Sequence, residues 1–168
     1  MITSKDENIT ILENLIKGAS NNWASAAAQF WSPDGNNGFN ERNITTYLHA
    51  EAVKSGAHVY CEIPTPNKKS GNLNARIDSL ILLGDCLYIV EAKRVYNIGG
   101  LRSILRDVDR LHQKEVLRNI LSKDKWWGKT PPPKQIYWLA ICEIWDEGKK
   151  KGAPDNKFKI FCPDYTSS

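Results

Sequence analysis

Three residues around a short turn have the types and the spacing of a site that could bind a divalent cation. Asp78 lies in one apolar segment, and Glu91 and Lys93 lie in the next. Only the dipeptide Gly84-Asp85 separates the two segments, and glycine at the first position of a two-residue loop is typical of a type II′ hairpin turn. The register of such a hairpin places Asp78 directly opposite Glu91, with Cβ atoms about 5 Å apart. Because side chains alternate along a strand, we expect Lys93 on the same face.

Two carboxylates this close together need a positive charge between them. The surrounding residues are apolar on both faces of the predicted hairpin, and a buried carboxylate without a partner is costly. Lys93 supplies one charge, and a hard cation such as Mg²⁺ or Mn²⁺ would supply more. Two simpler arrangements stay open, namely a buried ion cluster of Asp78, Lys93 and Glu91, and a sheet face exposed to solvent. A register slip of one residue would separate the two carboxylates.

The elements that would position these residues follow one another in an order typical of α/β proteins. Hydrophobic periodicity and turn residues predict helices at about 4–16, 23–31 and 40–54, strands at 58–63, 76–83 and 86–94, a helix at 101–121, and strands at 135–145 and 158–162. We expect residues 18–22 to break the first two helices apart and Gly56 to end the third. The α-β-β-β-α-β order predicts a central mixed β-sheet flanked by helices.

Length and charge restrict the class of protein. A chain of 168 residues suits a single domain over residues 1–168. A formal net charge of +4 permits a nucleic-acid partner without requiring one. No apolar run approaches the roughly 20 residues of a membrane helix, and the first seven residues lack a signal-peptide pattern. We therefore expect a cytoplasmic protein with no membrane partner.

Cysteine and histidine do not form a recognisable metal-binding pattern. The four cysteines are widely spread without a CxxC pair, and three of them lie in or beside apolar segments: Cys61, Cys86 and Cys142. We predict that these three are buried, inert thiols. The three histidines, His49, His58 and His112, form no cluster in the sequence, which disfavours a histidine metal site or a histidine general base.

At Asp78 and Glu91-Ala92-Lys93 the sequence resembles the PD-(D/E)XK superfamily, the restriction-endonuclease-like nucleases. Asp78 matches the first acid of the family motif, and Glu91-Ala92-Lys93 matches its E-x-K element at the end of an apolar strand. The order of the elements also matches. The resemblance covers about residues 40–145, so that residues 1–39 look like an added helical element. One departure from the motif is Ile77, which stands where the motif often has proline.

The resemblance implies a metal-dependent nuclease that hydrolyses phosphodiester bonds in DNA, with RNA left open as a substrate. Asp78, Glu91 and the carbonyl of Ala92 would hold Mg²⁺ or Mn²⁺, which would lower the pKa of a bound water. Lys93 would orient that water or stabilise the developing negative charge. The family often adds an acid from the preceding helix, and here we favour Glu41 because it shares the stripe of the predicted inner residues of that helix.

Other acids and the basic residues allow more than one interpretation. The competing helix acid is Glu51, while Glu62 is more simply a solvated strand end, and Glu41 itself could be an acid in the first turn of a helix. Four arginines are candidates for contacts with phosphates: Arg76, Arg94, Arg102 and Arg106. The helix over 101–121 is expected to pack through five aliphatic residues, Leu101, Ile104, Leu105, Val108 and Leu111. Arg102, Arg106 and Arg110 should lie largely on its other side, as a basic stripe or as an ordinary solvated face.

A rival hypothesis keeps the fold and removes the catalysis. The same fold also occurs in proteins that do not cleave nucleic acid, including small partners that inhibit other proteins. A short chain without an evident DNA-reading domain fits such a binding module, for example an inhibitor or immunity-type partner. Many members of the family cut two strands as dimers, so the resemblance also leaves a homodimer open.

Overall fold

The computed structural model describes residues 5–30, 42–65, 76–95, 98–111, 120–122, 132–144 and 159–161. Its elements, in chain order, are α1 (Lys5–Phe30), α2 (Arg42–Lys54), β1 (His58–Pro64), β2 (Arg76–Leu83), β3 (Cys86–Val95), α3 (Ile98–Leu111), β4 (Gln135–Ile144) and β5 (Lys159–Phe161). The predicted α-β-β-β-α-β order is therefore present from α2 to β4, with a helix before it and a strand after it. None of the described helices is long and apolar enough to cross a membrane.

The strands form one mixed five-stranded sheet in the order β1-β2-β3-β4-β5. Neighbouring strands are antiparallel except for β3 and β4, which run parallel. Parallel neighbours need a long crossover connection, and α3 forms part of the chain between these two strands. The prediction of an α/β fold with a central mixed sheet is confirmed.

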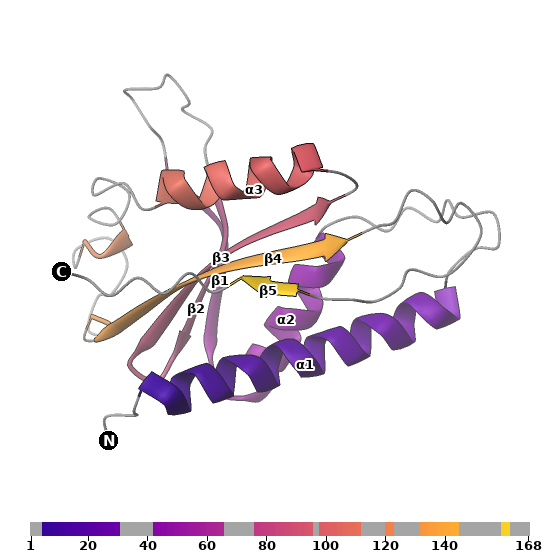
Figure 1. Ribbon diagram of the computed structural model, residues 1–168. Helices are drawn as coiled ribbons and strands as arrows, with labels where there is room; N and C mark the ends of the chain where they lie inside the picture. Colours follow the sequence, from indigo (N-terminus) through magenta and orange to yellow (C-terminus); the bar gives the residue numbers. More distant parts are fainter. Residues whose placement is uncertain are drawn as a thin grey trace.

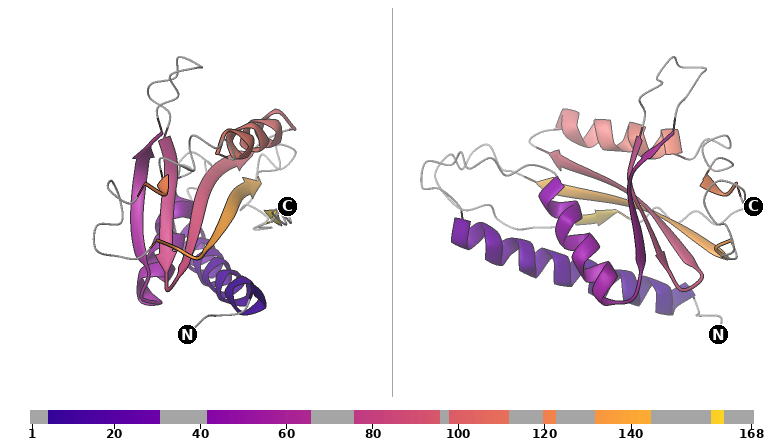
Figure 2. Two further views of the ribbon diagram at one scale, coloured as in Figure 1. Left: turned by 90° about the vertical axis from the view of Figure 1, so that its left-hand side faces the viewer. Right: turned by 180° about the vertical axis from the view of Figure 1, so that it is seen from behind.

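Helices cover both faces of the sheet, as Figures 1 and 2 show. On one face α1 and α2 pack against the sheet through a large apolar cluster that includes Leu15, Leu48 and Ile81. On the other face Ile104 of α3 packs against residues of β3 and β4. A third cluster on that second face lies farther along the sheet and contains Leu80, Leu82 and Ile120, among others. The sheet is thus the middle of three layers.

The N-terminal region contradicts the prediction of two short helices, because residues 5–30 form the single helix α1. Gly18, expected to break the helix, lies where α1 crosses α2. A Cβ atom at Gly18 would lie 2.8 Å from Oε2 of Glu51. Glycine therefore leaves room for the Glu51 side chain of α2, and the chain does not turn there.

Helix α1 is also an integral part of the core rather than an appendage. Trp23 is 1% exposed and its ring lies 6.0 Å from that of Tyr47. At the other end of the helix, the hydroxyl of Tyr88 donates a hydrogen bond to the carbonyl of Asn8. The side-chain amide of Asn8 in turn donates to Gln135 at the start of β4. These contacts tie both ends of α1 to the rest of the protein.

The two turns predicted from glycine have the expected geometry. Gly56 ends α2 with φ of 85°, and the amides of Gly56 and Ala57 donate to the carbonyls of Val53 and Ala52. This pattern is a Schellman motif, which satisfies the last carbonyls of a helix. Gly84 has φ of 61°. Asp85 is not among the described residues with positive φ, which makes the hairpin a type II′ turn as predicted.

Helix α3 differs from the prediction at its beginning and on one face. It begins at Ile98, so that the two glycines expected to precede it lie within it. A Cβ atom at Gly100 would lie 3.3 Å from the Cα of Val95, which explains why glycine occupies the first turn. Ile104 is buried as expected, whereas Leu105 is 52% exposed and does not belong to the packed face. Residues 112–119 of the predicted helix lie outside the described residues.

Candidate functional site

The β2–β3 hairpin has the predicted register, and its two strands separate where Asp78 and Glu91 meet. Paired residues run from Leu83 opposite Cys86 to Ser79 opposite Val90. The next pair in that register would be Asp78 and Glu91, but the ladder ends before it. Instead, Oδ2 of Asp78 accepts a hydrogen bond of 2.7 Å from the amide of Ala92.

The position of the Asp78 carboxylate follows from this hydrogen bond. A backbone amide in a strand points in the plane of the sheet toward the neighbouring strand. The carboxylate that accepts from Ala92 therefore lies between β2 and β3 and takes the place of a main-chain acceptor. At this point Asp78 can be reached from the side of Glu91 and from the side of α2.

A local distortion of β1 and β2 directs Asp78 in this way. Glu62 has φ of 55° and is the only residue with positive φ, apart from glycines, in the described part of the chain. Val59 packs against the α1–α2 cluster, yet Ile63, four residues later in the same strand, belongs to the cluster on the opposite face. Ile81 and Ile77 of β2 show the same change of face. Strain of this type costs about 1–3 kcal/mol and is often found at functional sites.

Glu91 is the most strongly perturbed acid near the hairpin. It is 6% exposed, and its Oε1 atom lies 2.9 Å from a guanidinium nitrogen of Arg110. Burial, followed by the negative charge of Asp78, raises the pKa of Glu91 to about 8, although Arg110 acts in the opposite direction. A hydrogen bond between the two acidic side chains contributes to the same rise of the pKa. Two adjacent carboxyl groups of this kind hold a proton or a cation between them at neutral pH.

Lys93 extends from β3 toward α3, on the same side of the sheet as Glu91. Its ammonium group lies 2.9 Å from Oδ2 of Asp107, and each side chain is about one-third exposed. Arg110, one helical turn beyond Asp107, also donates to the carbonyl of Arg76 at the start of β2. Asp107 and Arg110 of α3 are thus the oppositely charged partners of Lys93 and Glu91 on β3.

Sequence reasoning missed Asp107 and Arg110 as members of the site, and it placed Arg110 on the wrong side of α3. A signal was present, because Ile104, Asp107 and Arg110 follow one another at intervals of three residues. Residues at this spacing lie along one face of a helix. Since Ile104 was expected to face the sheet, the two charged residues could have been placed there as well.

A pocket of about 290 Å³ opens on the other side of Asp78, against α2. It is lined by Arg42, Thr45, Thr46, His49, Cys61, Glu62, Asp78 and Ala92. Nδ1 of His49 lies 3.5 Å from the Sγ atom of Cys61, and partial burial lowers the pKa of His49. Cys61 is exposed because it lines this pocket, so the prediction that it is buried was wrong. The predictions for Cys86 and Cys142 as buried thiols are confirmed.

The other acids predicted for the site are distributed as follows. Glu41 lies outside the described residues. Glu51 is directed to α1, where its Oε1 atom accepts a hydrogen bond from Asn22. The same oxygen pairs with Lys54 of α2. Glu62 lines the pocket and lies 3.6 Å from Arg42, with a side chain that is 47% exposed.

The residues that are present fit a hard divalent cation in their chemistry. Asp78, Glu91 and the carbonyl of Ala92 offer only oxygen atoms, which Mg²⁺ and Mn²⁺ prefer. Within the described ranges, no three or more side chains of His, Cys, Asp or Glu are already grouped as metal ligands. Two carboxylates and a main-chain carbonyl are nevertheless a common protein share for Mg²⁺, which usually keeps several waters.

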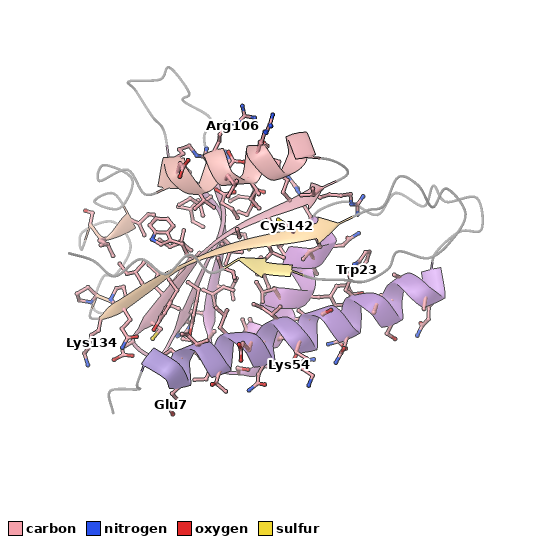
Figure 3. The ribbon with its side chains drawn as sticks, in the orientation of Figure 1. Glu7, Trp23, Lys54, Arg106, Lys134 and Cys142 are labelled. Atoms are coloured by element: carbon pink, nitrogen blue, oxygen red, sulfur yellow. The ribbon has the colours of Figure 1, made fainter. Side chains whose placement is uncertain are left out.

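The four arginines predicted to contact phosphates lie in different environments. Arg76 is exposed and donates to the carbonyl of Glu62. Arg94 is half-buried at the end of β3, whereas Arg102 and Arg106 are exposed on α3. Figure 3 shows the side chain of Arg106 on the side of α3 that points away from the sheet. Arg76 is linked to the acidic pair through its main-chain carbonyl, which accepts a hydrogen bond from Arg110.

In comparisons with known proteins, no family model and no curated protein matches the chain.

Proposed function

We propose that the protein is a Mg²⁺- or Mn²⁺-dependent nuclease with a PD-(D/E)XK-type site, built on a restriction-endonuclease-like fold. The observation that carries the proposal is the meeting of Asp78 and Glu91 where β2 and β3 separate. Both acids lie at the positions of the family motif, and Lys93 is one side-chain repeat away on the same face of β3. DNA is the proposed substrate, because most proteins with this motif act on DNA.

The residues have distinct tasks in this proposal. A divalent cation bound by Asp78, Glu91 and the carbonyl of Ala92 would lower the pKa of a bound water and screen the charge of the phosphate. The amide of Ala92 holds the Asp78 carboxylate in the plane of the sheet, so that this ligand is oriented before the cation arrives. Lys93 stabilises negative charge that develops on the phosphate oxygens. It must first leave Asp107, or share its ammonium protons between Asp107 and the phosphate.

The raised pKa of Glu91 supports the assignment of a cation-binding role. A buried carboxyl beside another acid is costly to ionise, and a divalent cation is the ligand that removes this cost most completely. Perturbed acids of this kind concentrate at functional sites.

The test incubates the purified protein with supercoiled, linear and single-stranded DNA, and with RNA, in the presence of Mg²⁺, Mn²⁺ or a chelator. We expect cleavage that the chelator abolishes. The Asp78→Asn and Lys93→Ala variants should each lose at least about 100-fold in rate, the usual effect of removing one charge-stabilising group. Asp109→Asn removes an acid from the exposed side of α3 and serves as the matched control. Cleavage that persists in both site variants would eliminate this site as the source of the activity.

A second function, a non-cleaving binding module, is favoured by one specific observation. Lys93 and Glu91 each already have an oppositely charged partner on α3, so the site can be electrically satisfied without a cation. Calorimetric titration with Mn²⁺ separates the two functions. A nuclease should bind Mn²⁺ in the wild type and lose this binding in Asp78→Asn. A binding module would take up no Mn²⁺ at these acids in either protein.

The proposed enzyme acts on DNA in the cytoplasm, either as a monomer that nicks one strand or as a homodimer that cuts both. Sedimentation analysis with and without a DNA duplex distinguishes these two forms. The ratio of nicked to linear product from supercoiled DNA provides the corresponding functional measurement.

A further inference from the structure

Arg110 occupies a position at Glu91 that a metal ion would also need. One guanidinium nitrogen lies 2.9 Å from Oε1 of Glu91 and 3.1 Å from the carbonyl of Arg76. The Arg110 side chain is 22% exposed, and the Glu91 side chain is 8% exposed. The contact is therefore a largely buried one between a guanidinium and a carboxyl group, and such contacts respond strongly when one partner is lost or replaced.

A carboxylate in a closed pair of this kind is not fully available as a metal ligand. The guanidinium of Arg110 contacts Oε1 of Glu91, and a divalent cation bound by the same carboxylate would be repelled by this positive charge. Binding of a cation at Glu91 and Asp78 must therefore weaken or break the contact with Arg110. The free protein loses part of its affinity for the cation in this exchange.

The present position of Arg110 also leaves one of its own donors unsatisfied. The Nε atom of Arg110 is buried and has no acceptor among the described residues. A buried donor without a partner costs about 1–3 kcal/mol. An anion with several oxygens could accept from this group, and a phosphate diester is the anion that the proposed reaction brings to Glu91 and Lys93.

We propose that Arg110 exchanges between Glu91 in the free protein and a phosphate of the bound nucleic acid, so that cation and nucleic acid each promote binding of the other. This inference rests on the proposed function and extends it to a residue outside the motif. Arg110 is a positioning residue for the cation, because it acts through Glu91. Since coupling between two ligands is reciprocal, it can be measured from either side.

The test measures Mn²⁺ affinity by calorimetry in the wild type and in Arg110→Gln, first without nucleic acid. Removing the competing guanidinium should strengthen Mn²⁺ binding about tenfold, as expected for the loss of one charge-assisted contact. Arg106→Gln removes the same charge from the exposed side of the same helix and controls for the general electrostatic effect in this titration. Arg110→Lys keeps the charge and should retain most of the competition.

The same titrations are then repeated with a short phosphorothioate DNA duplex, whose integrity is checked on a gel. In the wild type, the duplex should raise Mn²⁺ affinity about tenfold, a coupling of ordinary size. In Arg110→Gln this gain should shrink to about threefold or less, because the group that changes partner is absent. A variant that was merely destabilised would bind Mn²⁺ more weakly, so the direction of the change distinguishes the two explanations.

Each result decides the matter in one direction. Stronger Mn²⁺ binding in Arg110→Gln than in Arg106→Gln, with a smaller gain from DNA, supports the exchange. Equal or weaker binding in Arg110→Gln refutes it but leaves the proposed nuclease intact if the wild type binds Mn²⁺. Absence of Mn²⁺ binding in every protein, with or without DNA, refutes both proposals. If Arg110→Gln does not fold, the Arg110 guanidinium resonances of the wild type decide, because they must shift on saturation with Mg²⁺.

Discussion

Replacement of Glu91 by glutamine should remove a large pH dependence of stability in the metal-free protein. The pKa of Glu91 is raised from 4.5 to about 8 in the folded protein, mainly by burial and by Asp78. The folded state therefore binds a proton that the unfolded state releases above its ordinary pKa. This proton contributes its full share to the free energy of unfolding below the pKa of Glu91 in the unfolded state. The contribution is lost as the pH rises to the pKa of Glu91 in the folded state.

The size of the effect follows from the shift. At about 1.4 kcal/mol per pH unit, the full rise of the pKa of Glu91 corresponds to an upper limit of roughly 5 kcal/mol. Between about pH 5.5 and about pH 8, the free energy of unfolding of the wild type should fall by about 3 kcal/mol more than that of Glu91→Gln. Glutamine has the shape of the protonated acid but cannot ionise, so it removes this contribution without leaving a cavity.

The assay is urea unfolding at both pH values in the presence of a chelator, followed by fluorescence. Glu13→Gln, which removes an exposed acid of α1, controls for loss of a charge and should keep the pH dependence of the wild type. Saturating Mg²⁺ at about pH 8 should restore the stability of the wild type but not that of Glu91→Gln. An equal fall in the stability of Glu91→Gln and the wild type between the two pH values would show that Glu91 is not the source of the pH dependence.

Three further predictions concern the fold and the pocket. Trp23→Ala should lower the free energy of unfolding in urea by about 3–5 kcal/mol, because it leaves a large cavity between α1 and α2. A loss under about 1 kcal/mol would show that the packing of α1 contributes little to stability. Gly18→Leu should lower the free energy of unfolding by about 1–3 kcal/mol, because the leucine side chain would overlap Glu51. The control Ala28→Leu, on the exposed side of α1, should change it by less than about 0.5 kcal/mol. Iodoacetamide should label Cys61 before Cys86 and Cys142, the two buried cysteines among the described residues. The rate at Cys61 should rise with pH, because partial burial and the charge of Glu62 raise the pKa of this thiol and only the thiolate reacts. Mass spectrometry that finds a buried cysteine labelled first would contradict this prediction.

Local patterns in the sequence were sufficient for the hairpin that carries the motif. The type II′ turn depends on a single glycine, and its geometry fixes which residues of β2 and β3 oppose each other. The buried stripe of α2, with Ile44, Leu48 and Ala52, followed from helical periodicity for the same reason. In both cases the decisive interactions lie within a few residues or within one hairpin.

Features that depend on contacts between distant elements could not be predicted in this way. Gly18 has the appearance of a helix breaker until the approach of Glu51 from α2 is known. The change of face in β1 and β2 has its centre at Glu62. Glutamate rarely adopts positive φ, so no local pattern in the sequence predicts this change. Arg110 was placed on the solvated side because a charged residue usually lies there, whereas burial of Glu91 gives it a partner on the inner side.

In the proposed nuclease, the charges that meet at the hairpin would make the affinity of this surface for a phosphate diester depend on the cation. Five charged or ionisable side chains are connected here: Asp78, Glu91, Lys93, Asp107 and Arg110. With a proton on Glu91 their charges cancel, so the metal-free site has little net attraction for a phosphate diester. Replacement of that proton by a divalent cation leaves one net positive charge. In a largely buried setting such a charge acts strongly on an approaching anion. The acidic pair therefore favours phosphate binding only when the cation is present, which is the order of events that a metal-dependent nuclease requires.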